Sequence, residues 1–239
     1  MKVEEIFQVY KDNIMPTYNK TPLIFVKGKG SRLWDINGKV YLDFFPGWGV
    51  GNLGHCHPKV MQGLRDQVSK LIFVPNNYYH PFQAKLAKEL IYWSFPGKVF
   101  FCNSGAEANE GAIKLARKFG RGRYEIITFE NAFHGRTLAT LAATGQKKYQ
   151  SGFEPMPEGF KQVKFNDLDA VLHAITDKTA AIMLELVQGE GGINVAKRDF
   201  VLFLRKICDE HKLLLIIDEV QTGIGRTGKM FCYSNYGIT

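Results

Sequence analysis

Short apolar runs alternate with helical segments through most of the chain after residue 98, and this alternation limits the possible folds most strongly. Five runs have the length and apolar character of buried strands: Val99–Cys102, Glu125–Phe129, Gln162–Phe165, Ala180–Leu184 and Leu213–Ile217. Segments with helical periodicity lie between and after them: Gly105–Phe119, Gly135–Thr144, Leu168–Thr176 and Asp199–His211. Strands that are apolar throughout are typical of a parallel sheet covered by helices on both faces. The sequence therefore predicts an α/β fold with a mainly parallel sheet.

The first part of the chain has a different pattern of short strands, turns and loops. Asn37-Gly38 separates two short segments, which predicts a hairpin between Arg32–Ile36 and Val40–Phe44. Two helices are predicted farther on, at Pro58–Phe73 and Pro81–Ser94. We therefore divide the chain into residues 1–57, part of a smaller N-terminal α+β segment, and residues 58–239, a large α/β domain.

Composition excludes several classes of protein. With 45% hydrophobic and 23% charged residues, the chain has the composition of a folded globular protein. No apolar run approaches the roughly 20 residues of a membrane helix, and the acidic N-terminus lacks the apolar segment of a signal peptide. The 31 basic and 23 acidic side chains give a net charge of +8, but the densest basic group has the spacing of a solvated helix face. Four scattered cysteines predict reduced thiols. We expect a cytoplasmic protein with no nucleic-acid or membrane partner.

The first candidate site follows the run Val99–Cys102, where a helix is predicted to begin. Ser104 and Glu107 have the spacing of a capping box. Gly105 and Ala106 would leave their backbone N–H groups free, and a helix N-terminus with free N–H groups attracts an anion such as phosphate. The alternative is a well-capped helix that binds nothing.

A second candidate is Asp218, which ends an apolar run. A carboxylate in that position is costly to bury unless it has a cationic partner. The protonated ring nitrogen of a cofactor such as pyridoxal phosphate is one such partner. The alternative is an aspartate that caps the next turn.

A nucleotide-binding P-loop is a rival interpretation of the same region. Gly223–Lys229 has P-loop spacing, but Met230 stands where a magnesium-binding serine or threonine is needed. The segment also begins several residues after its strand instead of directly. These departures make the P-loop a remote alternative.

The remaining strand ends carry polar and aromatic residues that could share one site. Phe133 and Arg136 could stack on a ring and hold a carboxylate, and His134 is either a base or a structural hydrogen-bonding residue. Glu185 and Glu190 follow the next run. His55-Cys56-His57 lacks a second cluster of ligands, so no metal site is predicted.

Together these motifs resemble those of class III pyridoxal phosphate-dependent aminotransferases, in the acetylornithine and ornithine aminotransferase branch. Five segments carry the resemblance: Leu53–Pro58, Asn103–Glu110, Asn131–Thr137, Gln188–Gly192 and Asp218–Gly223. They occur in the order typical of the family and span the chain. The resemblance implies a type I pyridoxal phosphate-dependent transferase fold and a homodimer.

The resemblance also implies a role for individual residues. Gly105 and Ala106 would bind the cofactor phosphate, Phe133 would stack on the pyridine ring, and Gln221 would bind the phenolic oxygen. Asp218 would hold the pyridinium nitrogen. The substrate-binding residues would be Arg136, on the substrate carboxylate, and Glu190, as the partner of a second arginine.

The implied reaction moves the distal amino group of N-acetylornithine to 2-oxoglutarate, in arginine biosynthesis. Ornithine, 4-aminobutyrate and succinyldiaminopimelate remain open as alternative donors. Leu186 departs from the proline that is usual in the family. The lysine that forms the Schiff base in the family lies farther beyond Asp218 than Thr239, so no catalytic residue is assigned. We therefore expect an N-terminal fragment that is inactive alone.

Overall fold

The computed structural model describes residues 1–238. Its contacts divide the chain into two compact units, Met1–Tyr78 and a second unit from Tyr79 onward. Helix α2 belongs to the first of these units. The functional division at residues 57 and 58 remains a prediction.

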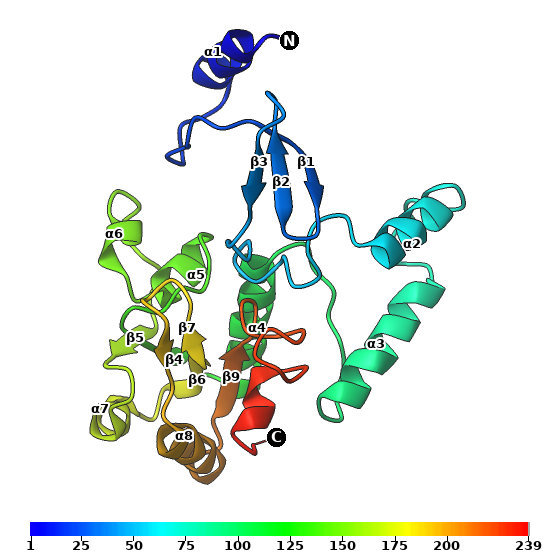
Figure 1. Ribbon diagram of the computed structural model, residues 1–239. Helices are drawn as coiled ribbons and strands as arrows, with labels where there is room; N and C mark the ends of the chain where they lie inside the picture. Colours follow the sequence, from blue (N-terminus) through cyan, green and yellow to red (C-terminus); the bar gives the residue numbers. More distant parts are fainter. Residues whose placement is uncertain (239) are drawn as a thin grey trace. The chain divides into compact units, whose positions relative to one another are not determined.

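The first unit contains a small antiparallel sheet (Figure 1). Its elements are α1 (Val3–Asn13), β1 (Phe25–Lys29), β2 (Arg32–Asp35), β3 (Val40–Leu42) and α2 (Pro58–Val68). The strand order is β1-β2-β3, and the predicted hairpin at Asn37-Gly38 joins β2 to β3. Gly38 has φ of +82°, which glycine adopts without strain, and Asp35 Oδ1 accepts hydrogen bonds from the backbone N–H groups of Asn37 and Lys39.

The second unit is built on a four-stranded sheet in which all neighbouring strands are parallel. The strands are β4 (Glu125–Phe129), β5 (Phe160–Val163), β6 (Thr179–Glu185) and β9 (Leu214–Asp218), in the order β5-β4-β6-β9. The predicted α/β class with a parallel sheet is confirmed. Strand β5 lies two residues earlier than the predicted Gln162–Phe165.

Helices accompany the sheet, and a short hairpin and a 3-10 turn complete the unit. They are α3 (Pro81–Trp93), α4 (Gly105–Gly120), α5 (Leu138–Ala143), α6 (Lys147–Gln150), α7 (Leu168–Ala174), β7 (Val187–Gln188), β8 (Asn194–Val195), α8 (Arg198–His211) and η1 (Cys232–Asn235). Helix α5 is shorter than the predicted Gly135–Thr144, so residues 135–137 are loop.

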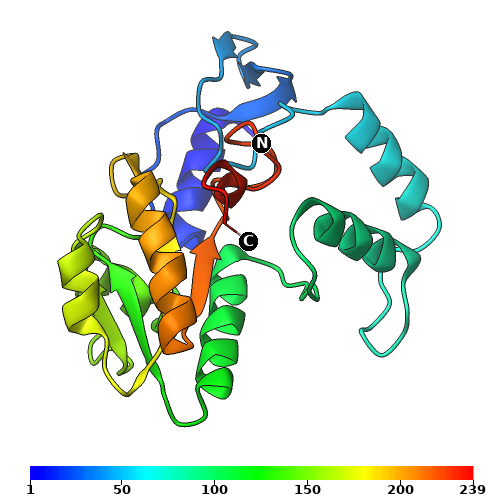
Figure 2. The same ribbon diagram turned by 90° about the horizontal axis from the view of Figure 1, so that it is seen from below.

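Alternate residues of the central strands pack into two separate cores. Ile127 of β4 and Ile182 of β6 pack in one core with residues of α8, whereas Ile126 and Met183 pack in the other with residues of α4. Figure 2 shows α4 and α8 on opposite sides of β9. Both faces of the sheet are therefore covered, and this is why its strands are apolar throughout.

The prediction of a strand at Val99–Cys102 is wrong, because the structure has no strand there. A strand needs a hydrogen-bonded neighbour, and this segment pairs with no strand among residues 1–238. Phe100 is 73% exposed. Apolar character alone does not specify a neighbouring strand.

Within the described part of the chain, no helix is both long and apolar enough to cross a membrane.

Candidate active site

The predicted site residues converge on the edge of the sheet where the parallel strands end. Glu185 is the last residue of β6 and Asp218 the last of β9, and the two are partners in the register of the sheet. Residue 105 opens α4, whose buried face packs on the same sheet. Ligands in sheets of this kind bind outside the carboxyl ends of the strands.

Asp218 is 7% exposed and is held by three hydrogen bonds. Its Oδ2 accepts from Asn109 Nδ2 at 2.8 Å and from His134 Nδ1 at 2.9 Å. Its Oδ1 accepts from the backbone N–H of Val220 at 3.0 Å. A carboxylate has about four lone-pair positions, so three bonds leave one acceptor position for a further donor.

His134 is a buried supporting residue of Asp218. Its backbone N–H donates to Thr144 Oγ1 at 3.0 Å, and its backbone carbonyl accepts from Asn109 Nδ2 at 2.7 Å. Because a carboxylate oxygen only accepts, the bond to Asp218 places a proton on Nδ1. The geometry supports the structural interpretation of His134 instead of the interpretation as a free base.

The start of α4 has the predicted cap. Ser104 Oγ accepts from the backbone N–H of Glu107 at 3.1 Å, and the Glu107 carboxylate accepts from the backbone N–H of Asn103. The backbone N–H groups of Gly105 and Ala106 have no hydrogen-bond partner within residues 1–238. They stand at the positive end of a 16-residue helix and can bind an anion.

Three glycines allow the loops around Asp218 to approach one another. A Cβ atom on Gly105 would lie 2.8 Å from Val220 Cγ2, and one on Gly135 would lie 2.9 Å from Ala106 Cβ. A Cβ atom on Gly189 would lie 2.5 Å from Gln221 Oε1. The start of α4 and the loops after β4, β6 and β9 are therefore neighbours, as the sequence predicted.

Phe133 and Arg136 both contact Tyr149 of α6. The ring centroids of Phe133 and Tyr149 are 5.7 Å apart in an edge-on arrangement, and the Arg136 guanidinium lies 5.1 Å from the Tyr149 centroid. Phe133 is half-buried and Arg136 is exposed. A guanidinium that stacks on an aromatic ring can also bind a carboxylate with two parallel hydrogen bonds.

Glu185 occupies the centre of this edge with 4% of its surface exposed. Its Oε2 accepts from the backbone N–H of Phe133 at 2.8 Å, and its Oε1 accepts from that of Gly189 at 3.3 Å. Burial raises the pKa of the Glu185 carboxyl to about 7, although His134 and the Phe133 N–H group oppose the shift.

Comparison with known proteins agrees with this geometry. The sequence model of the class-III aminotransferase family matches residues 14–239. The chain belongs to the class-III aminotransferases.

Relatives of this class-III aminotransferase chain have names that agree with one another. It is 54% identical to the acetylornithine aminotransferase of Methanocaldococcus jannaschii, over all of this chain and 61% of the relative. It is 48% identical to the acetylornithine aminotransferase of Myxococcus xanthus, over 98% of this chain and 60% of the relative. The chain thus spans about 60% of the length of these curated relatives.

Solved structures share the fold. The ornithine aminotransferase of Toxoplasma gondii has a TM-score of 0.94 and 30% identity, over all of this chain and 58% of that one. A second structure of the Toxoplasma gondii enzyme, with a TM-score of 0.94 and 31% identity over 99% of this chain and 57% of that one, is described as having partial occupancy of PLP at its active site. The acetylornithine aminotransferase of Elizabethkingia anophelis has a TM-score of 0.83 and 30% identity, over all of this chain and 58% of that one.

The segment Gly223–Lys229 of this class-III aminotransferase does not have P-loop geometry. Its backbone turns close on themselves, with Gly225 N–H donating to the Met230 carbonyl and Gly228 N–H to the Gly225 carbonyl. The four-residue 3-10 helix η1 follows, whereas a P-loop opens an α-helix.

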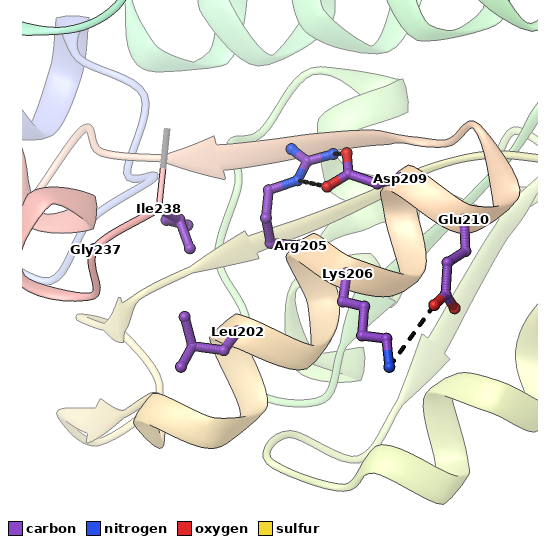
Figure 3. A pocket seen from close by; sticks show the side chains of 7 residues that line it. All are labelled: Leu202, Arg205, Lys206, Asp209, Glu210, Gly237 and Ile238. Atoms are coloured by element: carbon purple, nitrogen blue, oxygen red, sulfur yellow. Dashed lines mark hydrogen bonds and ion pairs between the residues drawn. The ribbon is translucent and has the colours of Figure 1, made fainter.

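An open hollow beside α8 has no cluster of unpaired charges (Figure 3). Arg205 pairs with Asp209 at 2.5 Å and Lys206 with Glu210 at 3.7 Å, each one helical turn apart. Among residues 1–238, no three His, Cys, Asp or Glu side chains are close enough to hold a metal ion. The edge of the sheet therefore remains the candidate active site of this class-III aminotransferase.

Asn109, Tyr149 and the function of Glu185 were missed by the sequence interpretation. For Asn109 a signal existed, because it shares the buried face of α4 with Ile113 and Ala116 at spacings of four and seven residues. A polar residue in that stripe needs a buried partner. Tyr149 had no such signal. Glu190 makes no ion pair in residues 1–238, so its predicted role is untested.

Proposed function

We propose that this chain is the N-terminal part of a pyridoxal phosphate-dependent aminotransferase that acts on N-acetylornithine and 2-oxoglutarate. One observation supports the proposal most: a buried carboxylate with a remaining acceptor position, Asp218, lies beside an open helix N-terminus. A cofactor with a protonated ring nitrogen and a phosphate matches these two features together.

The residues at the sheet edge fit pyridoxal phosphate. When bound, this cofactor acts as an electron sink for the carbon from which the amino group leaves. Asp218 would accept a hydrogen bond from the ring N–H, and the free backbone N–H groups of Gly105 and Ala106 would bind the phosphate. Phe133 would stack on the ring, and Gln221 would donate to the phenolic oxygen.

His134 and Asn109 keep Asp218 in place for this role. Two donors on one carboxylate oxygen fix its orientation, and burial excludes water that would compete for the remaining acceptor position. The Asp218 carboxylate, held in this orientation, would favour the protonated form of the ring nitrogen.

Arg136 and Glu190 are assigned to the substrates. The guanidinium of Arg136 binds the α-carboxylate of the amino donor, which leaves the distal amine at the cofactor. Glu190 pairs with an arginine that binds 2-oxoglutarate. Names of relatives at about 50% identity favour N-acetylornithine, and the similarity to the ornithine aminotransferase structure from Toxoplasma gondii makes ornithine the second candidate. 4-Aminobutyrate is a further alternative.

The remainder of the longer protein is proposed to supply three features: the lysine that bears the cofactor, the second arginine and much of a homodimer interface. The proposed location of the protein is the cytoplasm. Measuring kcat/KM of the longer protein for N-acetylornithine, ornithine and 4-aminobutyrate tests the substrate. We expect the highest value for N-acetylornithine, and a higher value for ornithine would contradict that choice.

Replacing Arg136 with lysine is expected to weaken substrate capture and leave cofactor binding almost unchanged. Lysine keeps the positive charge but loses the planar fork that binds a carboxylate with two hydrogen bonds. We expect KM for the amino donor to rise roughly tenfold to a hundredfold, the equivalent of about 1.5–3 kcal/mol. Steady-state kinetics and cofactor titration of the longer protein measure the two effects.

Arg117→Lys is the matched control for this substitution. The Arg117 guanidinium also lies over an aromatic ring, 5.4 Å from the centroid of Phe160, and donates to the Glu158 carbonyl. KM should be unchanged in this variant. If Arg136→Lys lowers cofactor affinity and leaves KM for the donor unchanged, Arg136 does not bind the substrate.

A further inference from the structure

The buried carboxyl of Glu185 joins two loops that lie far apart in the sequence. One oxygen accepts from the backbone N–H of Phe133 and the other from that of Gly189. Both loops lie at the carboxyl edge of the sheet, next to Asp218, which is the register partner of Glu185. A carboxylate can hold both N–H groups because each of its oxygens is an acceptor.

These loops carry three of the seven residues assigned to cofactor and substrate. The loop after β4 bears Phe133 and Arg136, and the loop after β6 bears Glu190. The approach of Gly189 to Gln221 also brings the second loop against the residue assigned to the phenolic oxygen. A shift of either amide therefore moves a group that is proposed to contact the cofactor or the substrate.

We propose that Glu185 is a positioning residue that fixes the loops bearing Phe133 and Glu190 to each other and to the edge of the sheet. We call the two hydrogen bonds of Glu185 to the N–H groups of Phe133 and Gly189 the anchor. Its importance for catalysis rests on the proposed function, whereas its effect on the two loops does not. Glu185 acts through the two backbone N–H groups and is not assigned a contact with the substrate.

The charge of Glu185 gives the anchor a pH dependence. His134 from the loop after β4 and Asp218 from β9 are the charged or titratable groups that act on it, and its pKa lies at about 7. Above that pH both oxygens accept as a carboxylate. Below it a proton occupies one oxygen and weakens one of the two bonds.

The contribution of Glu185 to global stability has the opposite pH dependence, and this difference distinguishes a positioning role from a role in stability alone. A carboxyl whose pKa is raised on folding binds its proton more tightly in the folded state, so its contribution to the free energy of unfolding falls as pH rises from about 4.5 to about 7. The two loops held by Glu185 should therefore become more ordered as pH rises toward about 7, while the contribution of Glu185 to the free energy of unfolding falls. If Glu185 served only the stability of the fold, the order of the loops and the free energy of unfolding would change with pH in the same direction.

Hydrogen exchange of the cofactor-free longer protein tests the anchor directly. Glu185→Gln keeps the shape of the side chain, but its amide nitrogen cannot accept, so one of the two bonds is lost. At pH 8 we expect at least one of the N–H groups of Phe133 and Gly189, the one that faces the new amide nitrogen, to exchange roughly tenfold to a hundredfold faster than in the unsubstituted protein. Unchanged exchange at both would overturn the proposal.

Glu125→Gln is the matched control. Glu125 begins β4 at the opposite edge of the sheet, and it also accepts two hydrogen bonds, from Lys161 Nζ and Thr176 Oγ1. Its replacement should leave the exchange at Phe133 and Gly189 unchanged. If the N–H groups of Phe133 and Gly189 exchanged faster by the same factor in both variants, the cause would be a general loss of stability, and the proposal would be overturned.

Cofactor titration supplies the second measurement. At pH 8 the dissociation constant for pyridoxal phosphate should be roughly tenfold higher in Glu185→Gln than in the unsubstituted longer protein, and the ratio should shrink toward pH 6. A ratio that does not change with pH contradicts the positioning role. An unsubstituted protein that binds no pyridoxal phosphate contradicts the proposed function instead, and the exchange measurement still decides the anchor.

Discussion

Asp218→Asn is expected to lower the turnover of the longer protein by at least about 100-fold, the loss typical of removing a preorganised electrostatic group. An asparagine cannot balance the charge of a protonated ring nitrogen. Its NH2 group would also face a donor in either orientation: Asn109 Nδ2 and His134 Nδ1 in one, and the backbone N–H of Val220 in the other. Turnover with saturating donor and cofactor measures the effect.

Asp35→Asn is the matched control for this variant. Asp35 is also 7% exposed, and it also accepts three hydrogen bonds, from the N–H groups of Asn37 and Lys39 and the hydroxyl of Tyr41. Its replacement is expected to reduce stability without a comparable loss of turnover by the folded protein. Undiminished transamination in Asp218→Asn would show that Asp218 is not the partner of the ring nitrogen.

The chain of 239 residues is expected to have no measurable aminotransferase activity, even with saturating pyridoxal phosphate. Transamination needs an amine that binds the cofactor covalently, is displaced by the substrate and then moves a proton between substrate and cofactor. Lys229 lies in a tight turn after β9 and matches no lysine of the family. We expect a rate roughly a thousandfold or more below that of the longer protein.

Borohydride reduction distinguishes the possible reasons for inactivity. Reduction after addition of pyridoxal phosphate fixes the cofactor on any lysine that has reacted with it, and peptide mapping identifies that lysine. No label at a unique position is expected in the 239-residue chain. A label on Lys229 together with glutamate-dependent turnover would contradict the assignment of the catalytic lysine to the longer protein.

Local sequence patterns predicted most of the fold because burial on both faces leaves a clear signal. Strand β4 lies where it was predicted, and β6 and β9 differ from prediction by one residue at each end. Val99–Cys102 was predicted wrongly because a strand also needs a hydrogen-bonding partner, which apolar character does not specify. The loop at residues 135–137 was predicted as helix because the apolar pattern was extended past Thr137, which is the N-cap of α5.

The site was predicted in part for a similar reason. Asp218 and the start of α4 are recognisable because each combines a strand or helix end with an unusual polar group. Their partners are harder to predict, since Asn109 and His134 reach Asp218 from elements 109 and 84 residues away. Sequence spacing does not specify contacts of that range. Glu185 was placed at the correct edge, but only the structure reveals its two backbone donors.

A crystal structure of the longer protein with bound pyridoxal phosphate would show whether the edge of the sheet holds the cofactor. We expect the phosphate to lie within hydrogen-bonding distance of the backbone N–H groups of Gly105 and Ala106. We also expect the ring nitrogen to lie within hydrogen-bonding distance of the Asp218 carboxylate. A phosphate on the segment Gly223–Lys229, or a ring nitrogen with no contact to Asp218, would show that the cofactor binds elsewhere or in another orientation.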